Sequence, residues 1–365
     1  MTPRENLISL YNRTGYEYAP VYFVLCPSLI TEFEKRYGNT VSYRDFFNFP
    51  VKLISDPGFS WDEVRPGFVP EREFEWDKYY TEPLHPKARV DIWGIAHEPG
   101  SKDCVHMTLM RHPLENLQTL KELEEYPWPD FYQSDFSVFK PEIEGAHANG
   151  YAAHVWMECT IWEVAWYLRR MEILMTEMMM EDEKAYFLFD KITELACHRA
   201  REFAKLGIDI LALGDDIGMQ SSTIMDHDLY RAWIKPRLTK VIEAAKSVNP
   251  DIIIQYHSCG FAKPFIPDLI EAGIDVLNPV QPEACMDFGE IHREYGNHLS
   301  FNGTLGTQTT MPFATPKQVK ELTTKNLGIA GKKGGLLCCP THMLEPEVPW
   351  ENIEAYMEAC REFKV

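Results

Sequence analysis

The stretch IIIQYHSCG, at residues 252–260, decides the fold that the sequence predicts. Its first part, 252–258, is a short β-rich run that is typical of a strand. Gly260 then allows the chain to turn sharply, and runs with helical periodicity lie on both sides, at 228–247 and 264–272. A strand between two helices is typical of a parallel sheet with crossover helices. The stretch therefore predicts one βα unit of an α/β fold.

The same alternation of strand and helix runs through most of the chain. Further candidate strands lie at 20–26, 152–158, 209–214, 276–280, 299–303 and 335–339. Further helical runs lie at 161–180, 183–206, 316–329 and 350–362. We expect one more strand from residues 50–110. Eight strands that alternate with helices predict a (β/α)₈ barrel, also called a TIM barrel.

The N-terminal third carries an elaboration of this barrel. Segments 88–97 and 104–112 predict a hairpin, joined by the turn-rich residues 98–101. We interpret the whole of 56–130, which is rich in proline and tryptophan, as a cap over one end of the barrel. No internal repeat is visible, and we expect residues 1–365 to form a single domain.

The charge and the cysteines of the chain indicate where it works and what it binds. The 365 residues include 36 Lys and Arg against 55 Asp and Glu, which gives a formal net charge of −19. Such a surface repels phosphate backbones and anionic lipid, so we expect neither nucleic acid nor a membrane as a partner. The chain lacks any run of about 18 apolar residues, and its nine cysteines show no CxxC and no paired framework. We therefore expect a cytoplasmic protein with reduced thiols.

A histidine and a cysteine stand at the end of the strand 252–258, where barrel enzymes place their active sites. Side chains i and i+2 of a strand face the same side, so His257 and Cys259 point the same way. An imidazole and a thiolate make half of a tetrahedral zinc site. His and Cys are also common in ordinary cores, so a zinc site needs ligands from other strand ends.

The last candidate strand offers such a ligand. It continues into Cys338, Cys339, Pro340, Thr341 and His342. If the chain stays extended, His342 shares a face with Cys338, and Cys339 points toward the surrounding helices. His342 is therefore the expected third zinc ligand.

Three carboxylates also stand at the ends of candidate strands. Glu158 is the last residue of 152–158, and Asp215 and Asp216 follow 209–214. We expect them to face the same pocket as the metal and at least one of them to bind substrate or complete the zinc shell. Aspartates also commonly cap the segment that follows them, which leaves a structural interpretation open.

The second half of the chain resembles a known family. The matching segments are LGIDILALGDDIG (206–218), YHSCGFAKPFIPDLIEAGIDVLNPVQP (256–282), YGNHLSFNGTLGTQ (295–308) and GGLLCCPTHMLEPEVPWENIEA (334–355). In order and spacing they resemble the uroporphyrinogen decarboxylase superfamily, especially its corrinoid-dependent methyltransferase branch. The resemblance implies the same (β/α)₈ barrel.

Two departures from the superfamily pattern narrow the expected activity. The first candidate strand runs into Leu25-Cys26-Pro27-Ser28-Leu29, without the arginines that follow it in the true decarboxylases, so porphyrin decarboxylation is not expected. The zinc methyltransferases of the superfamily bind metal through a His-x-Cys, matched here by His257 and Cys259, and through a distant cysteine. His342 stands where that cysteine is expected, with Cys338 and Cys339 as reserve ligands.

The resemblance, read with this substitution, leads to an expected reaction. A neutral imidazole in place of a thiolate leaves zinc with more positive charge and makes it a stronger Lewis acid, suited to an ether oxygen that leaves as an anion. We expect an O-demethylating methyltransferase that takes methyl from a methoxylated, aromatic small molecule and passes it to Co(I) of a separate corrinoid protein.

Alternatives to this reaction stay open at this point. They are methyl transfer from methylcobalamin to a thiol or to tetrahydrofolate, a lyase like uroporphyrinogen decarboxylase, and a non-catalytic protein that binds a corrinoid or another small molecule. A homodimer is also left open as an assembly.

Overall fold

A curled parallel sheet forms the centre of the structure, a computed structural model that describes residues 1–56, 75–100 and 108–365. Seven strands pair in the order β1-β5-β6-β7-β8-β9-β10, and each neighbouring pair is parallel. They are β1 (Val51–Ser55), β5 (Ala152–Trp156), β6 (Ile210–Gly214), β7 (Ile253–His257), β8 (Val276–Asn278), β9 (Ser300–Asn302) and β10 (Leu336–Leu337). The predicted eighth strand from residues 50–110 is β1. The chain has the predicted (β/α)₈ fold.

The segment 20–26 occupies the edge next to the last strand but is not the regular strand that the sequence predicts. Only Leu25 forms a bridge, with Leu344, after β10. Tyrosine hydroxyls satisfy part of its backbone instead, because the Tyr356 hydroxyl accepts the Tyr22 N–H at 3.0 Å and the Tyr43 hydroxyl accepts the Leu25 N–H at 3.4 Å.

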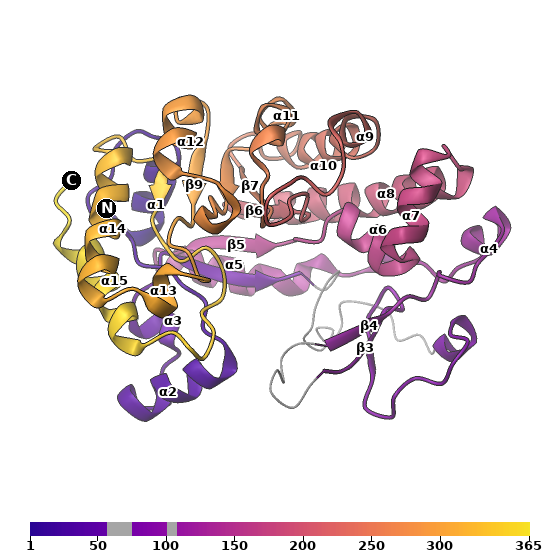
Figure 1. Cartoon of the computed structure of the whole chain (residues 1–365), viewed down its shortest axis with the longest axis horizontal. Coiled ribbons are helices and arrows are strands. Elements are labelled where there is room, and N and C mark those ends of the chain that lie inside the picture. The colour runs from indigo at the N-terminus through magenta and orange to yellow at the C-terminus, as the bar shows by residue number, and fades with distance from the viewer. Residues whose placement is uncertain (57–74, 101–107) are drawn as a thin grey trace.

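Helices surround the sheet, as the α/β pattern requires (Figure 1). Those before β6 are α1 (Pro3–Tyr11), α2 (Pro27–Tyr37), α3 (Tyr43–Phe46), α4 (Leu120–Glu124), α5 (Lys140–Ala148), α6 (Trp162–Arg169), α7 (Met171–Met179) and α8 (Glu183–Lys205). Those after it are α9 (His227–Trp233), α10 (Lys235–Lys246), α11 (Ile266–Ala272), α12 (Phe288–Tyr295), α13 (Thr310–Phe313), α14 (Pro316–Ala330) and α15 (Trp350–Glu362). Both termini lie at the end of the molecule where α14 and α15 pack on each other.

Two predicted helical runs are each divided in two, for reasons that lie in the backbone. The run 161–180 breaks into α6 and α7 at Arg170, whose φ of +71° is incompatible with a right-handed helix. The run 228–247 breaks into α9 and α10 just before Pro236, which lacks the N–H of a helix interior and favours a helix start.

The cap contains a small antiparallel sheet of β2 (Arg89–Val90), β3 (Ala96–Pro99) and β4 (Thr108–Arg111). Strands β3 and β4 pair in the register Ala96↔Arg111 to Pro99↔Thr108, so the predicted pairing of the two segments is confirmed. The predicted turn was placed too early, because Glu98 and Pro99 belong to β3. Residues 101–107, like 57–74 of the expected cap, lie outside the described residues.

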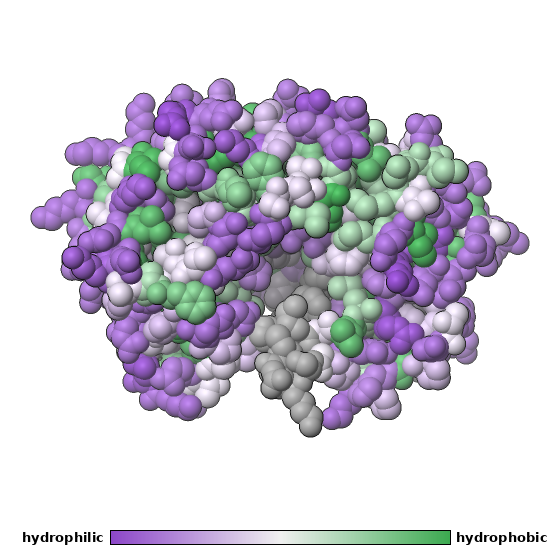
Figure 2. All heavy atoms as spheres, in the orientation of Figure 1, coloured by the Kyte–Doolittle hydropathy of each residue, from purple (hydrophilic) through white to green (hydrophobic). Residues whose placement is uncertain are grey.

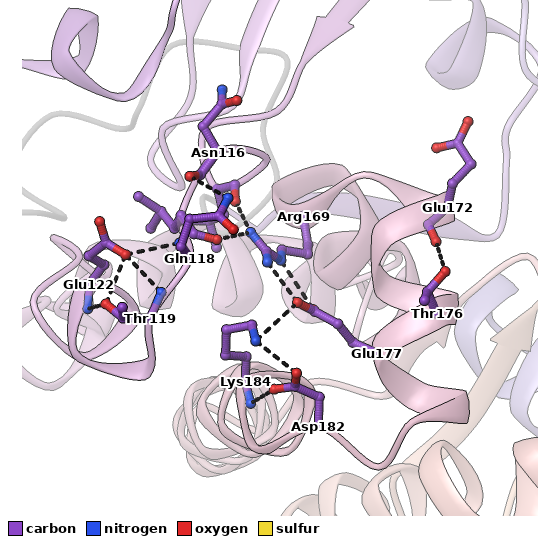
Figure 3. Close-up of polar contacts among 12 residues, drawn as sticks. Asn116, Gln118, Thr119, Glu122, Arg169, Glu172, Thr176, Glu177, Asp182 and Lys184 are labelled. Atoms are coloured by element: carbon purple, nitrogen blue, oxygen red, sulfur yellow. Dashed lines mark hydrogen bonds and ion pairs between the residues drawn. The ribbon is translucent and has the colours of Figure 1, made fainter.

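Arg169, at the end of α6, joins the chain that follows β4 to the helices (Figure 3). Its buried guanidinium donates to the carbonyl oxygens of Leu114 and Leu117 and, at 2.7 and 3.1 Å, to the carboxylate of Glu177. Lys184 approaches the same carboxylate at 3.7 Å. A buried charge with all these partners is stable, whereas removal of one partner typically costs about 3–5 kcal/mol. The cap is therefore held firmly beside α6.

Among the described residues, no helix has both the length and the apolar character needed to cross a membrane.

Candidate functional site

Three neighbouring strands, β5, β6 and β7, bring polar side chains together where they end. Gly214 of β6 pairs with His257 of β7, so Asp216 follows β6 next to Cys259, which follows β7. Glu158 follows β5, the neighbour of β6 on its other side. In a parallel barrel these ends meet at the face where active sites are found.

Asp216, His257 and Cys259 form a group of side chains that can hold a metal ion. One ligand atom from each lies within 4.8 Å of the other two. The Cys259 Sγ and the His257 Nε2 are 3.4 Å apart, and this nitrogen lies 3.7 Å from the Asp216 Oδ1. The prediction that His257 and Cys259 lie on the same side is confirmed.

Two glycines allow the loops that carry these residues to touch. Gly260 has a φ of +83°, and a Cβ there would lie 2.6–2.7 Å from backbone atoms of Gly218 and Met219. The loop after β6 therefore packs directly against the loop after β7, which any larger residue would prevent. This close approach lets the Asp216 Oδ1 accept the Cys259 N–H at 2.7 Å.

Asn278 fixes the orientation of the His257 ring. Its Nδ2 donates to the carbonyl oxygen of Asn302 at 2.9 Å, so its Oδ1 faces His257 and accepts the Nδ1–H at 2.7 Å. The Nε2 is then the ring nitrogen that faces Cys259 and Asp216 and that can bind a metal ion. Such a hydrogen bond to the far nitrogen is typical of metal-binding histidines.

The electrostatics of the group favour a cation. Burial alone would lower the pKa of His257, but the carboxylate of Glu158 and the thiol of Cys259 reverse this and raise its pKa well above the ordinary value. A pocket that stabilises a positive charge on a buried ring also stabilises a metal cation.

Glu158 stands beside this group with one oxygen unused. Its Oε1 lies 3.7 Å from the His257 Nδ1, and its side chain is 10% exposed. The same Oε1 is buried and has no hydrogen-bond partner. Burial raises the pKa of the Glu158 carboxyl to about 7, so both its ionised and its protonated forms are present near neutral pH.

Asp215, in contrast to its neighbour, is engaged with a helix. It is fully buried, and its Oδ1 accepts the Ile161 and Glu163 N–H groups, at 3.0 and 2.9 Å, where α6 begins. A carboxylate at a helix N-terminus satisfies free N–H groups and complements the helix dipole. Burial nevertheless raises the pKa of Asp215 to about 7. The geometry thus gives Asp215 a structural position, away from the cavity described below.

Glu163 is a residue that the sequence did not single out. Its Oε2 accepts the Asp216 N–H at 3.1 Å, and its Oε1 accepts the hydroxyl of Tyr167 at 2.7 Å. Burial raises the pKa of Glu163 to about 8. The spacing of Glu163 and Tyr167 by four residues predicts their pairing on a helix, but nothing local in the sequence indicates that they hold Asp216.

The end of the last strand differs from the prediction. The His342 ring lies beside His257, with 6.3 Å between ring centroids, and burial lowers the pKa of His342. The Cys339 thiol donates to the Asn302 Oδ1 at 3.0 Å, whereas the Cys338 Sγ lies 3.5 Å from the Thr304 hydroxyl.

The predicted parity of this strand end is therefore wrong. Asn302 lines the central cavity and is the partner of Cys339, whereas Thr304 binds Asn326 of α14 and is the partner of Cys338. The chain bends at 341–342 rather than staying extended, so alternation cannot be carried through to His342. Neither of these cysteines, nor His342, which the sequence predicts as the third ligand, belongs to the group formed by Asp216, His257 and Cys259; Asp216 takes that place.

A cavity of about 360 Å³ adjoins the group; we call it the central cavity. It is lined by Tyr22, Phe23, Val24, Trp156, Glu158, Cys159, Gln255, His257, Asn278, Asn302, Pro340, Thr341, His342 and Met343. A second cavity of about 620 Å³ shares Thr341, His342 and Met343 with it and is also lined by Cys259. Figure 2 shows the surface hollowed between the region of α2, α3 and α13 and the region of the cap.

Comparisons with known proteins support the resemblance found in the sequence. A curated uroporphyrinogen decarboxylase from Chloroherpeton thalassium is 25% identical over 164 residues, which are 42% of this chain and 45% of that protein. One from Pseudomonas fluorescens is 20% identical over 258 residues, 67% of this chain and 69% of that protein. The chain thus spans less than half the length of the first of these relatives.

A solved structure of a methyltransferase from Methanosarcina mazei has the same fold. It covers 100% of this chain and 99% of its own, with a TM-score of 0.70 and 18% identity. The model of the family described as uroporphyrinogen decarboxylase (URO-D) matches residues 159–363. Because this match covers more than half of the chain, the chain belongs to the uroporphyrinogen decarboxylase family.

Proposed function

We propose that this chain is a zinc-dependent methyltransferase that removes the methyl group of a methoxylated aromatic compound and transfers it to Co(I) of a separate corrinoid protein. One observation carries the proposal: oxygen, nitrogen and sulfur ligands from Asp216, His257 and Cys259 gather within 4.8 Å of one another beside the central cavity. The likeness of the whole chain to a methyltransferase supports methyl transfer as the reaction class.

The residues present fit zinc. The donor set of carboxylate, imidazole and thiolate is one that zinc accepts, and Asn278 orients His257 for metal binding. Asp216, His257 and Cys259 would hold the ion, with His342 as the fourth ligand. When bound, zinc would act as a Lewis acid toward the ether oxygen of the substrate.

The place of Asp216 changes the charge argument made from the sequence. A set with two imidazoles and one thiolate leaves zinc one unit of positive charge, but a carboxylate from Asp216 offsets it. The preference for an ether over a thiol therefore depends on the central cavity and on Glu158 as well as on the replacement of a cysteine by His342.

The side chains of the cavity supply the remaining chemistry. The walls formed by Phe23, Trp156 and Met343 bind an apolar ring and exclude water. The C–O bond to the methyl group breaks, and its electron pair stays on the oxygen. Glu158 holds a proton that this oxygen accepts as it leaves. The two electrons of Co(I) form the new bond to the methyl carbon, so the products are a phenol and a methylated corrinoid.

Porphyrin decarboxylation fits this cavity poorly. Uroporphyrinogen carries several carboxylates, which need cationic partners. Among the described residues that line the central cavity there is no arginine and no lysine, and one of them is the acidic Glu158.

The proposal is tested with the purified chain, zinc, cob(I)alamin and a panel of methoxylated compounds. We expect methylated cobalamin to form, visible by absorption spectroscopy, and Cys259→Ala to abolish both zinc binding and methyl transfer. Cys197→Ala is the matched control, because Cys197 lies on α8 and lines neither cavity. Fast methylation of a thiol from methylcobalamin, without cleavage of any ether, would contradict the proposal.

A further inference from the structure

We propose that Glu163 is a positioning residue of the metal site: its hydrogen bond to the backbone of Asp216 directs the Asp216 carboxylate toward the other ligands. The inference rests on the proposed function, because it takes Asp216 to be a zinc ligand. It gives a role in metal binding to α6, a helix from which none of the proposed ligands comes.

The Asp216 carboxylate depends on its backbone for its direction. Its side chain is 42% exposed, against 13% for His257, so the packing of neighbours does little to fix it. Its Oδ1 nevertheless accepts the Cys259 N–H at 2.7 Å and lies 3.7 Å from the His257 Nε2. A rotation of the Asp216 backbone would carry the carboxylate away from both residues. A ligand as exposed as this one needs a fixed main chain.

The loop that carries Asp216 is held from two sides. On the side of β7, the Ile217 N–H donates to the Ser258 hydroxyl at 3.1 Å. On the side of α6, the Asp216 N–H donates to the Glu163 Oε2 at 3.1 Å. Without the second bond, the backbone at Asp216 could turn about its contacts with the β7 loop. Glu163 therefore supplies the restraint that acts on the ligand residue itself.

Glu163 is itself fixed at both ends. Its backbone N–H donates to the Asp215 Oδ1 at 2.9 Å, and its Oε1 accepts the hydroxyl of Tyr167 at 2.7 Å, one turn later on α6. Glu163 and the two aspartates thus bond reciprocally, since each side contributes one backbone N–H and one side-chain oxygen. Such a support differs from an ordinary surface contact, because neither partner can move without breaking a second bond.

The test compares two neutral replacements of Glu163. Glu163→Gln can turn its amide oxygen toward the Asp216 N–H and its N–H₂ toward the Tyr167 hydroxyl, whereas Glu163→Leu has a similar size and no acceptor. Both variants lose the charge, so they differ in the hydrogen bond. Competition with a zinc chelator measures the zinc affinity of each full-length chain. We expect Glu163→Leu to bind zinc at least about 10-fold more weakly than the wild type, as the loss of an outer-shell partner does, and Glu163→Gln to restore most of the affinity.

Cobalt(II) bound in place of zinc provides a second readout. Its absorption spectrum depends on the number and geometry of the ligands. We expect Glu163→Gln to reproduce the spectrum of the wild type and Glu163→Leu to change it. A residue that only stabilised the fold would lower the free energy of unfolding and leave the spectrum of the folded, metal-loaded chain unchanged.

Tyr167→Phe takes the place of Glu163→Leu if that variant does not fold. It removes the partner of the Glu163 Oε1 and should weaken zinc binding by about 3-fold or more, the effect of one hydrogen bond. Tyr230→Phe is the matched control, because the Tyr230 hydroxyl is buried and has no hydrogen-bond partner. We expect this control to bind zinc as the wild type does.

The outcomes separate this inference from the proposed function. A zinc affinity and cobalt spectrum in Glu163→Leu equal to those of the wild type would overturn the inference and leave the proposed function standing. An equal loss of affinity in Glu163→Leu and Glu163→Gln would do the same, since the hydrogen bond would not be its cause. An unchanged affinity in Tyr167→Phe would overturn the inference where that variant is used. A wild-type chain that binds no zinc would contradict the proposed function and the inference together.

Discussion

Substitution of each of the two adjacent aspartates by asparagine should distinguish a role in stability from a role in metal binding. Asp215 supports α6 through the N–H groups of Ile161 and Glu163, whereas Asp216 belongs to the group of metal-compatible side chains. Asp215→Asn should therefore destabilise the fold and keep the zinc. Asp216→Asn should keep the fold and lose zinc affinity.

The size of the first effect follows from the contacts of Asp215. The Oδ2 of Asp215 also lies 3.2 Å from the Ile161 N–H, so the amide N–H₂ of Asp215→Asn faces a buried donor and remains unpaired. An unpaired buried polar group costs about 1–3 kcal/mol, and we expect Asp215→Asn to lower the free energy of unfolding by about 2 kcal/mol. Burial raises the pKa of Asp215 to about 7, so ionisation of this carboxyl costs stability as the pH rises toward 7, and the two proteins are compared at pH 6, below this pKa.

The second effect is measured on the same preparations. The Asp216 side chain is 42% exposed, so its replacement should change the unfolding free energy by less than about 1 kcal/mol. Loss of one anionic ligand should weaken zinc binding by at least about 10-fold, as even the loss of an outer-shell partner does. Denaturant unfolding and competition with a zinc chelator give the two quantities. Zinc loss in Asp215→Asn at unchanged stability, with normal zinc binding in Asp216→Asn, would refute the assignment.

Three further predictions concern single side chains. Glu158→Gln should lower the turnover of ether cleavage by about 10² or more, the usual contribution of a positioned acid, and a rate within a factor of three of the wild type would show that no proton comes from Glu158. His342→Cys should lower ether demethylation, because an added thiolate weakens the Lewis acid, and faster demethylation in a steady-state assay would contradict this. Burial lowers the pKa of His154 to about 4 from 6.5, so the unfolded chain binds a proton more readily, and stability is lost as the pH falls from 6.5 to 4. This loss reaches about 3 kcal/mol, and His154→Phe should remove it, which denaturant unfolding at pH 7 and pH 4.5 would show.

Much of the fold was predictable because each barrel strand carries its own pattern. The run 252–258 has the β-rich pattern of a strand, and the helical runs on both sides of it predict that it pairs in parallel with the neighbouring strands. The segment 20–26 is also rich in residues that favour strands, but its backbone bonds to tyrosine hydroxyls of α3 and α15. Because these hydroxyls come from residues distant in the chain, the local sequence pattern cannot reveal that 20–26 is not a regular strand.

Part of the candidate site was also predictable from the sequence, as part of the fold was. Strand alternation correctly placed His257 and Cys259 on one side, because both lie in or directly after a strand. Alternation failed beyond Cys339, where the chain bends. The different positions of Asp215 and Asp216 depend on where α6 begins, more than 50 residues earlier in the chain. The sequence shows two identical side chains, and only their partners distinguish them.

Metal analysis of the purified chain, after incubation with zinc and exhaustive dialysis, tests the central claim most directly. The arrangement of Asp216, His257 and Cys259 predicts one zinc per chain in the wild type and in Cys197→Ala. It predicts a near-complete loss in Cys259→Ala, with the fold retained by circular dichroism. A wild-type chain without zinc, or a full complement of zinc in Cys259→Ala, would contradict the account.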